Sequence, residues 1–227
     1  MNTWQYIGSL SDASILLPCI YLLHRFKYIS GINKIIVFFI FITLARNIAA
    51  VSLEVARELC QCPLYNLFFY NWHNLLSFSC LSWIFFEFFK EKFYQWGLVL
   101  ANVSVYAVAL LEPDTILHLN AKEFSDVAFM LSRVYSIVLF LLFFYRLLQQ
   151  LTVPILTRYP LFWFSAGGLL YYAGTLFPYL FLKYTFHNSN VELAQQYWMI
   201  EAFLSMVFSV FLALSVWYMK PSDDTVQ

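Results

Sequence analysis

The feature that most constrains the fold of this chain is a series of apolar segments, each long enough to cross a lipid bilayer. A membrane-spanning helix needs about 20 predominantly apolar residues. Seven stretches qualify: residues 6–24, 32–53, 64–88, 93–112, 126–148, 159–183 and 196–219. The sequence therefore predicts an all-α polytopic membrane protein, folded as a single seven-transmembrane-helix bundle without a soluble domain.

The composition agrees with lipid as the solvent. Of the 227 residues, 62% are hydrophobic and only 11% are charged, whereas soluble domains carry about 25% charged residues. A soluble fold could not cover so much apolar surface with so few polar side chains. The formal net charge is zero, which gives no basis for binding nucleic acid. We expect the lipid bilayer to be the main partner of this chain.

The distribution of lysine and arginine predicts the orientation, because loops rich in these residues stay in the cytoplasm. One set of loops carries three of them: Arg57, Lys122 and Lys183. The opposite set carries eight: Arg25, Lys27, Lys34, Lys90, Lys92, Arg146, Arg158 and Lys220. The second set is therefore predicted to be cytoplasmic, which places the N-terminus outside the cell and the C-terminus in the cytoplasm.

Polar side chains within the predicted spans gather on one side of the membrane. A charged group at mid-membrane costs about 3 kcal/mol on insertion scales and usually faces the bundle interior. In the predicted orientation, nine candidates lie in the outer half or the middle of the bundle: Asp12, Arg46, Asn47, Asn71, His73, Asn74, Arg133, Tyr172 and Glu201. We interpret them as ligand-binding residues of an outward-facing cavity, in which the arginines attract an anionic or polar group.

A structural interpretation stays open for the same residues. The two arginines could pair with Asp12 or Glu201 and simply hold helices in register, and a lone histidine such as His73 is commonly a hydrogen-bonded bundle residue. In either case we expect Arg46 and Arg133 to face the interior with a carboxylate or an anion nearby, because an unpaired guanidinium among acyl chains is very unfavourable.

The sixth predicted span has an unusual backbone. Gly167, Gly168 and Gly174 lack side chains, and Pro178 lacks the amide hydrogen that a helix uses. These residues allow two interpretations. One is close packing against neighbouring helices, and the other is a helix that bends in response to the contents of the cavity.

Several chemistries lack the residues that they need. Every lysine lies at a loop or a span boundary, so no Schiff-base lysine is available for retinal. The sequence has neither an HExxH zinc motif nor a GxSxG nucleophile motif, and we expect no metal, no cofactor and no enzymatic activity. Cys60 and Cys62 match no disulfide or zinc framework, and their role stays unassigned.

Stretches in the C-terminal half of the chain resemble those of known membrane proteins. The stretches are Tyr159–Phe164, Gly168–Phe177, Arg133–Ser136 and Tyr197–Glu201. They resemble small, uncharacterised bacterial proteins with seven transmembrane helices, some of which are encoded near sensor histidine kinases. The resemblance implies a multi-pass protein of the bacterial cytoplasmic (inner) membrane with a role in signalling.

Three functions are consistent with these patterns. The first is a membrane-embedded sensor or accessory subunit that binds a small polar or anionic ligand and signals through a membrane-protein partner or a second copy of itself. The second is a transporter or proton-linked channel, with Asp12, His73 and Glu201 as a relay. The third is a structural subunit of a membrane complex. We favour the sensor because the inner half of the bundle has few polar residues.

Overall fold

The computed structural model describes residues 3–29, 31–60, 66–118, 125–150, 156–187 and 191–219. Within these ranges every regular element is helical, which confirms the predicted all-α class. The α-helices are α1 (Thr3–Ser14), α2 (Leu16–Arg25), α3 (Ile32–Cys60), α4 (Leu67–Phe88), α5 (Lys92–Leu110), α6 (Pro113–Ile116), α7 (Asp126–Gln150), α8 (Pro160–His187) and α9 (Val191–Trp217). Short 3-10 helices cover Phe26–Tyr28 and Leu156–Arg158. Cys62, Lys122 and Lys220 lie outside the described residues.

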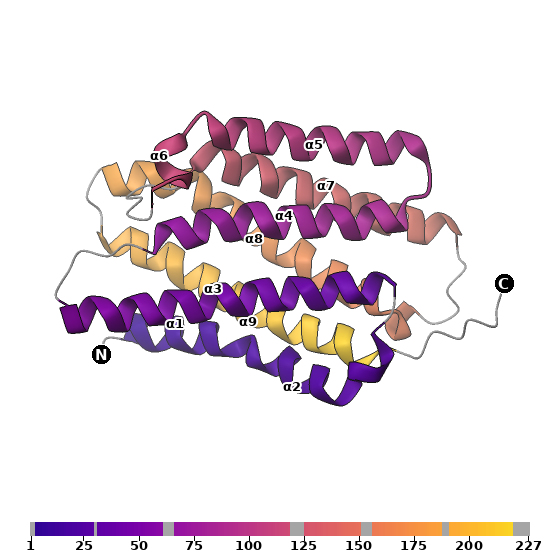
Figure 1. Cartoon of the computed structure of the whole chain (residues 1–227), viewed down its shortest axis with the longest axis horizontal. Coiled ribbons are helices and arrows are strands. Elements are labelled where there is room, and N and C mark those ends of the chain that lie inside the picture. Colours follow the sequence, from indigo (N-terminus) through magenta and orange to yellow (C-terminus); the bar gives the residue numbers. More distant parts are fainter. Residues whose placement is uncertain are drawn as a thin grey trace.

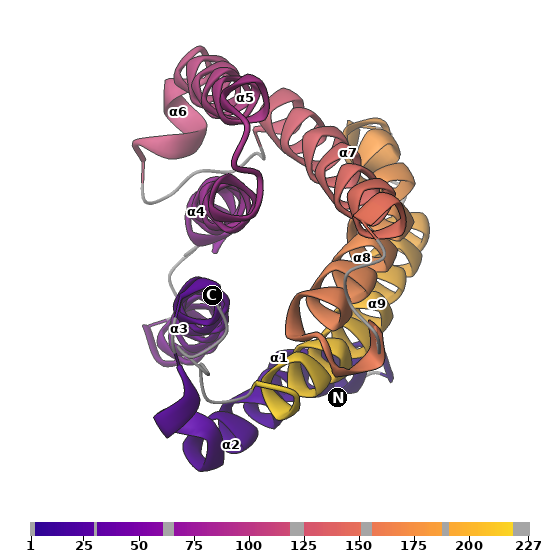
Figure 2. The same cartoon turned by 90° about the vertical axis from the view of Figure 1, so that its right-hand side faces the viewer.

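The long helices lie side by side, and successive ones run in opposite directions (Figure 1). Seen end-on, the joined α1 and α2, then α3, α4, α7, α8 and α9 follow one another around a ring (Figure 2). The ring closes where α9 packs against α1 and α2, and α5 lies outside it in contact with α4 and α7. This order brings the first and last helices of the chain together.

Helices α1 and α2 together form one crossing of the bundle, with an interruption of the helical pattern at Ile15. The physical cause is Pro18 in the first turn of α2. Proline has no N–H to donate to the carbonyl of Ser14, and its ring opposes a regular turn at that point. The polar residues just before the interruption, at the end of α1, belong to the candidate site.

Five segments of the described chain are long and apolar enough to cross a membrane: Tyr6–Arg25, Ile32–Arg57, Lys92–Leu110, Asp126–Gln149 and Gln195–Trp217. They coincide with five of the predicted spans. The predicted spans 64–88 and 159–183 coincide with α4 and α8, which are long helices with more polar and aromatic side chains. The described residues thus form an all-α chain with five candidate membrane spans. Helices α4 and α8 are not counted in these five, and they pack between them in the bundle.

Phenylalanine fills the interior of one half of the bundle, the half that contains the end of α2 and the start of α3. Phe39 of α3 packs edge-to-face on Phe164 of α8, and Phe85 of α4 packs in the same way on Phe140 of α7, each pair with ring centroids 5.6 Å apart. Phe208 of α9 contacts both Phe39 and Phe164. All five rings are buried. Side chains therefore fill the interior at the level of these rings.

The glycines of α8 mark close helix packing. A Cβ atom at Gly168 would overlap the ring of Phe140 on α7, and a Cβ atom at Gly167 would overlap Phe211 on α9. Helix α8 runs unbroken through Pro178. Of the two interpretations that the sequence allows, the structure therefore supports packing: small residues let α8 approach both neighbours closely.

Candidate functional site

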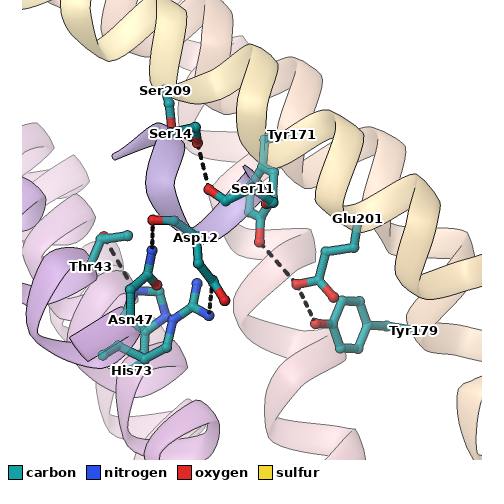
Figure 3. Close-up of polar contacts among 11 residues, drawn as sticks. Ser11, Asp12, Ser14, Thr43, Asn47, His73, Tyr171, Tyr179, Glu201 and Ser209 are labelled. Carbon is teal, nitrogen blue, oxygen red and sulfur yellow. Dashed lines mark hydrogen bonds and ion pairs between the residues drawn. The ribbon is translucent and has the colours of Figure 1, made fainter. Parts of the chain in front are cut away.

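An ion pair connects α1 and α3 in the half of the bundle that phenylalanine does not fill. Arg46 Nη1 lies 3.5 Å from Asp12 Oδ1, and the neighbouring Asn47 donates from Nδ2 to the backbone carbonyl of Asp12 at 2.8 Å. Figure 3 shows Asn47 reaching Asp12 in this way. The guanidinium of Arg46 also stacks on the Tyr70 ring of α4, with its Cζ 4.6 Å from the ring centroid. One arginine thus joins α1, α3 and α4.

A carboxylate connects α9 to α8. Glu201 accepts a hydrogen bond from the Tyr179 hydroxyl at 2.7 Å and another from the Tyr171 hydroxyl at 3.3 Å, both at Oε1 (Figure 3). Tyr171 and Tyr179 are eight residues apart on α8 and therefore share a face of that helix. Glu201 also lines both of the cavities described below.

Arg133 of α7 is the most deeply buried charged side chain in the described part of the chain, with only 3% of its surface exposed. Its Nη1 donates to the Thr175 hydroxyl, and its Cζ lies 4.0 Å from the centre of the Tyr179 ring. The rings of Phe129, Tyr171 and Tyr172 lie within 6 Å as well. Cation–π contacts of this kind contribute about 2 kcal/mol when desolvated.

The two arginines therefore differ in their anionic partners. Both face the interior as predicted, and Arg46 has the expected carboxylate in Asp12. Among the described residues, no carboxylate lies within 4.0 Å of Arg133. The predicted carboxylate is therefore confirmed for Arg46. Hydroxyls and aromatic rings surround the charge of Arg133, and the predicted alternative of a nearby anion stays a prediction for this residue.

The polar residues of α4 divide between two faces. His73 Nε2 lies 3.3 Å from the Thr43 hydroxyl and 3.2 Å from the Ser77 hydroxyl, and Asn74 Oδ1 accepts from Ser132 of α7 at 3.1 Å. Both residues point into the bundle.

Asn71 lies elsewhere and binds backbone groups. It donates to the Thr115 carbonyl at 2.7 Å and accepts from the Ser125 amide at 3.3 Å. These bonds fix α4 to α6 and to the start of α7. Of the nine predicted site residues, Asn71 is the one whose contacts lead away from the others.

An open cavity of about 530 Å³ lies between α1, α3, α9 and the beginning of α4. Ligand pockets commonly measure about 300–1,000 Å³, so this one is large enough for a small organic molecule. Its charged lining residues are Asp12, Arg46 and Glu201, and Tyr70 and Trp198 supply aromatic surface. Three of the predicted site residues thus meet in one cavity.

A much smaller void of about 30 Å³ lies deeper in the same half of the bundle. Six predicted residues line it: Arg46, His73, Asn74, Arg133, Tyr172 and Glu201. Arg46, Tyr70 and Glu201 line both spaces and so separate the open cavity from the void. Asn47 lines neither space and acts through its bond to the backbone of Asp12.

Sequence reasoning missed Tyr70 and Ser77, although their spacing could have identified them. Tyr70, His73, Asn74 and Ser77 stand at positions i, i+3, i+4 and i+7, which share one face of a helix. All four line the void. Trp198 was missed in the same way, since it precedes Glu201 by three residues on α9 and also lines the open cavity.

The described residues do not bring three or more histidine, cysteine, aspartate or glutamate side chains together as metal ligands. No protein-family model matches the sequence, and neither a curated protein nor a solved structure is similar to it. The resemblance to bacterial seven-helix proteins thus stays a prediction, and the function has to be argued from the geometry of the two spaces.

Proposed function

We propose that this protein is a seven-span membrane receptor, with its N-terminus outside, that binds a small polar or anionic ligand in the open cavity and signals through a membrane-protein partner or a second copy. In this proposal α4 and α8 complete the set of spans. With a rise of about 1.5 Å per residue, the 22 residues of α4 and the 28 of α8 exceed the hydrocarbon thickness of about 30 Å. Polar residues of these helices such as Asn74, Ser77 and Thr175 are buried in the interior, where the bilayer does not penalise them.

The observation that carries the proposal is the lining of the open cavity. An amphipathic space of about 530 Å³ presents a guanidinium, two carboxylates and aromatic rings on four different helices. A small zwitterionic or anionic molecule would find both hydrogen-bond donors and acceptors there. Glu201 would transmit occupancy to α8, because it holds the hydroxyls of Tyr171 and Tyr179.

The orientation is tested by cysteine labelling in a variant without the four native cysteines. We expect single cysteines at Glu123, which lies outside the described residues, and at His187 to react with a membrane-impermeant maleimide in intact cells. A cysteine at Lys90 should react only after permeabilisation. The reverse labelling pattern would place the open cavity on the cytoplasmic side and contradict the proposal of an extracellular ligand.

The ligand site is tested by filling the cavity without changing its charges. Gly8 lines the open cavity, and a Cβ atom added there meets nothing within 4 Å, so Gly8→Phe should occupy the space and keep the fold. The probes are amino acids, dicarboxylates and phosphorylated small molecules, screened by the shift that they cause in the thermal unfolding of purified protein. A compound that binds in this cavity should lose at least about tenfold in affinity, which is about 1.4 kcal/mol.

The matched control is Gly97→Phe, because Gly97 on α5 also has open space around it and lies far from the cavity lining. This variant should bind each compound as the natural protein does. Undiminished binding by Gly8→Phe would show that the ligand site lies elsewhere.

One observation favours transport as a second candidate function. Another cavity of about 530 Å³ opens at the opposite end of the bundle, where Asn33, Glu87, Lys90 and Tyr159 are among its lining residues. The buried phenylalanines lie between the two cavities along the helices, so a transporter would have to move them. Accumulation of a bound compound in proteoliposomes would establish transport, and binding without flux favours the receptor.

A further inference from the structure

The small void beneath the open cavity contains an excess of hydrogen-bond donors. Arg46 Nε, Arg133 Nε and Asn74 Nδ2 are all buried, and none of them has an acceptor among the described residues. All three side chains line the void of about 30 Å³. Buried donors without a partner cost about 1–3 kcal/mol each, so three of them around one space call for a common acceptor.

The balance of charges around the void also indicates a missing acceptor. Two guanidinium groups line it, and the only carboxylate that lines it, among the described residues, is Glu201. Glu201 already accepts two tyrosine hydroxyls, and Asp12 meets Arg46 from the side of the open cavity. Arg133 is left without a carboxylate contact in the described chain, and the void is the space that its side chain adjoins.

The size of the void limits the acceptor to a very small species. A space of about 10–15 Å³ holds one water molecule, and a void of about 30 Å³ therefore excludes sulfate, phosphate and organic acids. By this measure the void has room for about two water molecules, which could accept hydrogen bonds from the three donors but carry no charge. A monatomic anion accepts from every donor around it and also neutralises the buried guanidinium.

We propose that this void is a binding site for a small monovalent anion such as chloride, held by Arg133, Arg46 and Asn74. These residues belong to α7, α3 and α4 respectively, so the anion would join three helices around the ring. The site is separate from the open cavity, and it does not depend on the ligand proposed for that cavity. Its occupation would stabilise the folded bundle by ordinary binding linkage.

The test measures thermal unfolding of the full-length protein in detergent, with sodium chloride against sodium gluconate at constant ionic strength. We expect the midpoint to rise with chloride concentration, by about 3–6 °C once chloride exceeds its Kd about tenfold. Asn74→Asp replaces the unpartnered Nδ2 with a carboxylate oxygen of the same size, which should supply the missing acceptor. This variant should fold and lose the chloride dependence.

Two controls separate this site from others. Arg146→Gln removes an arginine that pairs with Glu91 on the far side of the bundle from the void, and it should keep the full chloride shift. Gly8→Phe should keep it as well, because that change fills only the open cavity.

Bromide provides a measurement that does not depend on any variant. Crystals of the natural protein grown with sodium bromide should show an anomalous peak between Arg133, Arg46 and Asn74. Equal unfolding midpoints in chloride and gluconate would overturn the proposal and assign the void to water. A bromide peak only at other positions, or a chloride shift that survives Asn74→Asp, would overturn it too.

Discussion

Replacing Gly168 with alanine should lower the free energy of unfolding by about 1–3 kcal/mol or more, the range for overpacking a well-filled interior. The added Cβ atom would overlap the ring of Phe140. That ring cannot move aside, because Phe85, Phe164 and Tyr172 pack around it with centroids 5.6–6.2 Å away. Helix α8 would have to separate from α7, and unfolding of the purified protein in detergent measures the cost.

A control and a rescue make this prediction specific. Gly97→Ala on α5 adds the same methyl group where nothing lies within 4 Å, and it should leave stability unchanged or raise it by up to about 1 kcal/mol. Phe140→Leu removes the ring atoms that the new methyl group would overlap. The double variant Gly168→Ala/Phe140→Leu should therefore be more stable than the sum of the two single effects implies, by about 0.5–3 kcal/mol. Additive effects would place the cause of the Gly168 loss elsewhere.

The positions of the helices could be predicted from the sequence better than the contacts between them. Apolar runs of about 20 residues indicate membrane spans without any tertiary information, and helices of the described chain coincide with most of each of the seven predicted segments. α4 and α8 were predicted as spans from length and general hydrophobicity, and both enclose polar or aromatic residues in the interior. Neither helix is among the five segments that are long and apolar enough to be identified as candidate spans. Composition alone therefore identifies them less clearly.

Contacts between distant residues could not be predicted in the same way. The sequence placed Asp12, Arg46 and Glu201 in the outer part of the predicted bundle, and the structure brings all three to one cavity. Depth says nothing about the direction in which a side chain points around its helix, and Asn71 turns toward Thr115 and Ser125 instead. For the same reason the sequence could not decide which arginine has a carboxylate partner and which one would need an anion.

The glycines illustrate a second limit of sequence reasoning. Small residues in a membrane helix predict close packing as a class, and α8 fulfils that expectation. The residues that occupy the space beside Gly168 and Gly167 are Phe140 of α7 and Phe211 of α9. No local pattern in the sequence connects these pairs, because they depend on how α8 is rotated and on which helices follow it around the ring.

The second prediction with a large effect on stability concerns the ion pair between Asp12 of α1 and Arg46 of α3. We expect Asp12→Asn to lower the free energy of unfolding by about 2 kcal/mol, because it strands the Arg46 guanidinium, whose side chain is only 12% exposed. Breaking a fully buried pair costs about 3–5 kcal/mol, and the smaller value follows from the 30% exposure of the Asp12 side chain. The bond from Asn47 to the backbone of residue 12 does not depend on the carboxylate, so the loss reports on the charge alone.

A double-mutant cycle then separates the ion pair from other effects of the substitutions. Arg46→Gln should cost less than Asp12→Asn, because the carboxylate that it leaves is more exposed and can be hydrated. The double variant should recover much of the loss of Asp12→Asn, with a coupling energy of about 1–2 kcal/mol. The control is the pair of Glu54 and Arg57, in which Arg57 Nη2 lies 4.0 Å from Glu54 Oε1 and both side chains are more than half exposed. The coupling energy of this pair should stay below about 0.5 kcal/mol. Equal couplings for the two pairs would mean that Arg46 is stabilised mainly by the Tyr70 ring and not by Asp12.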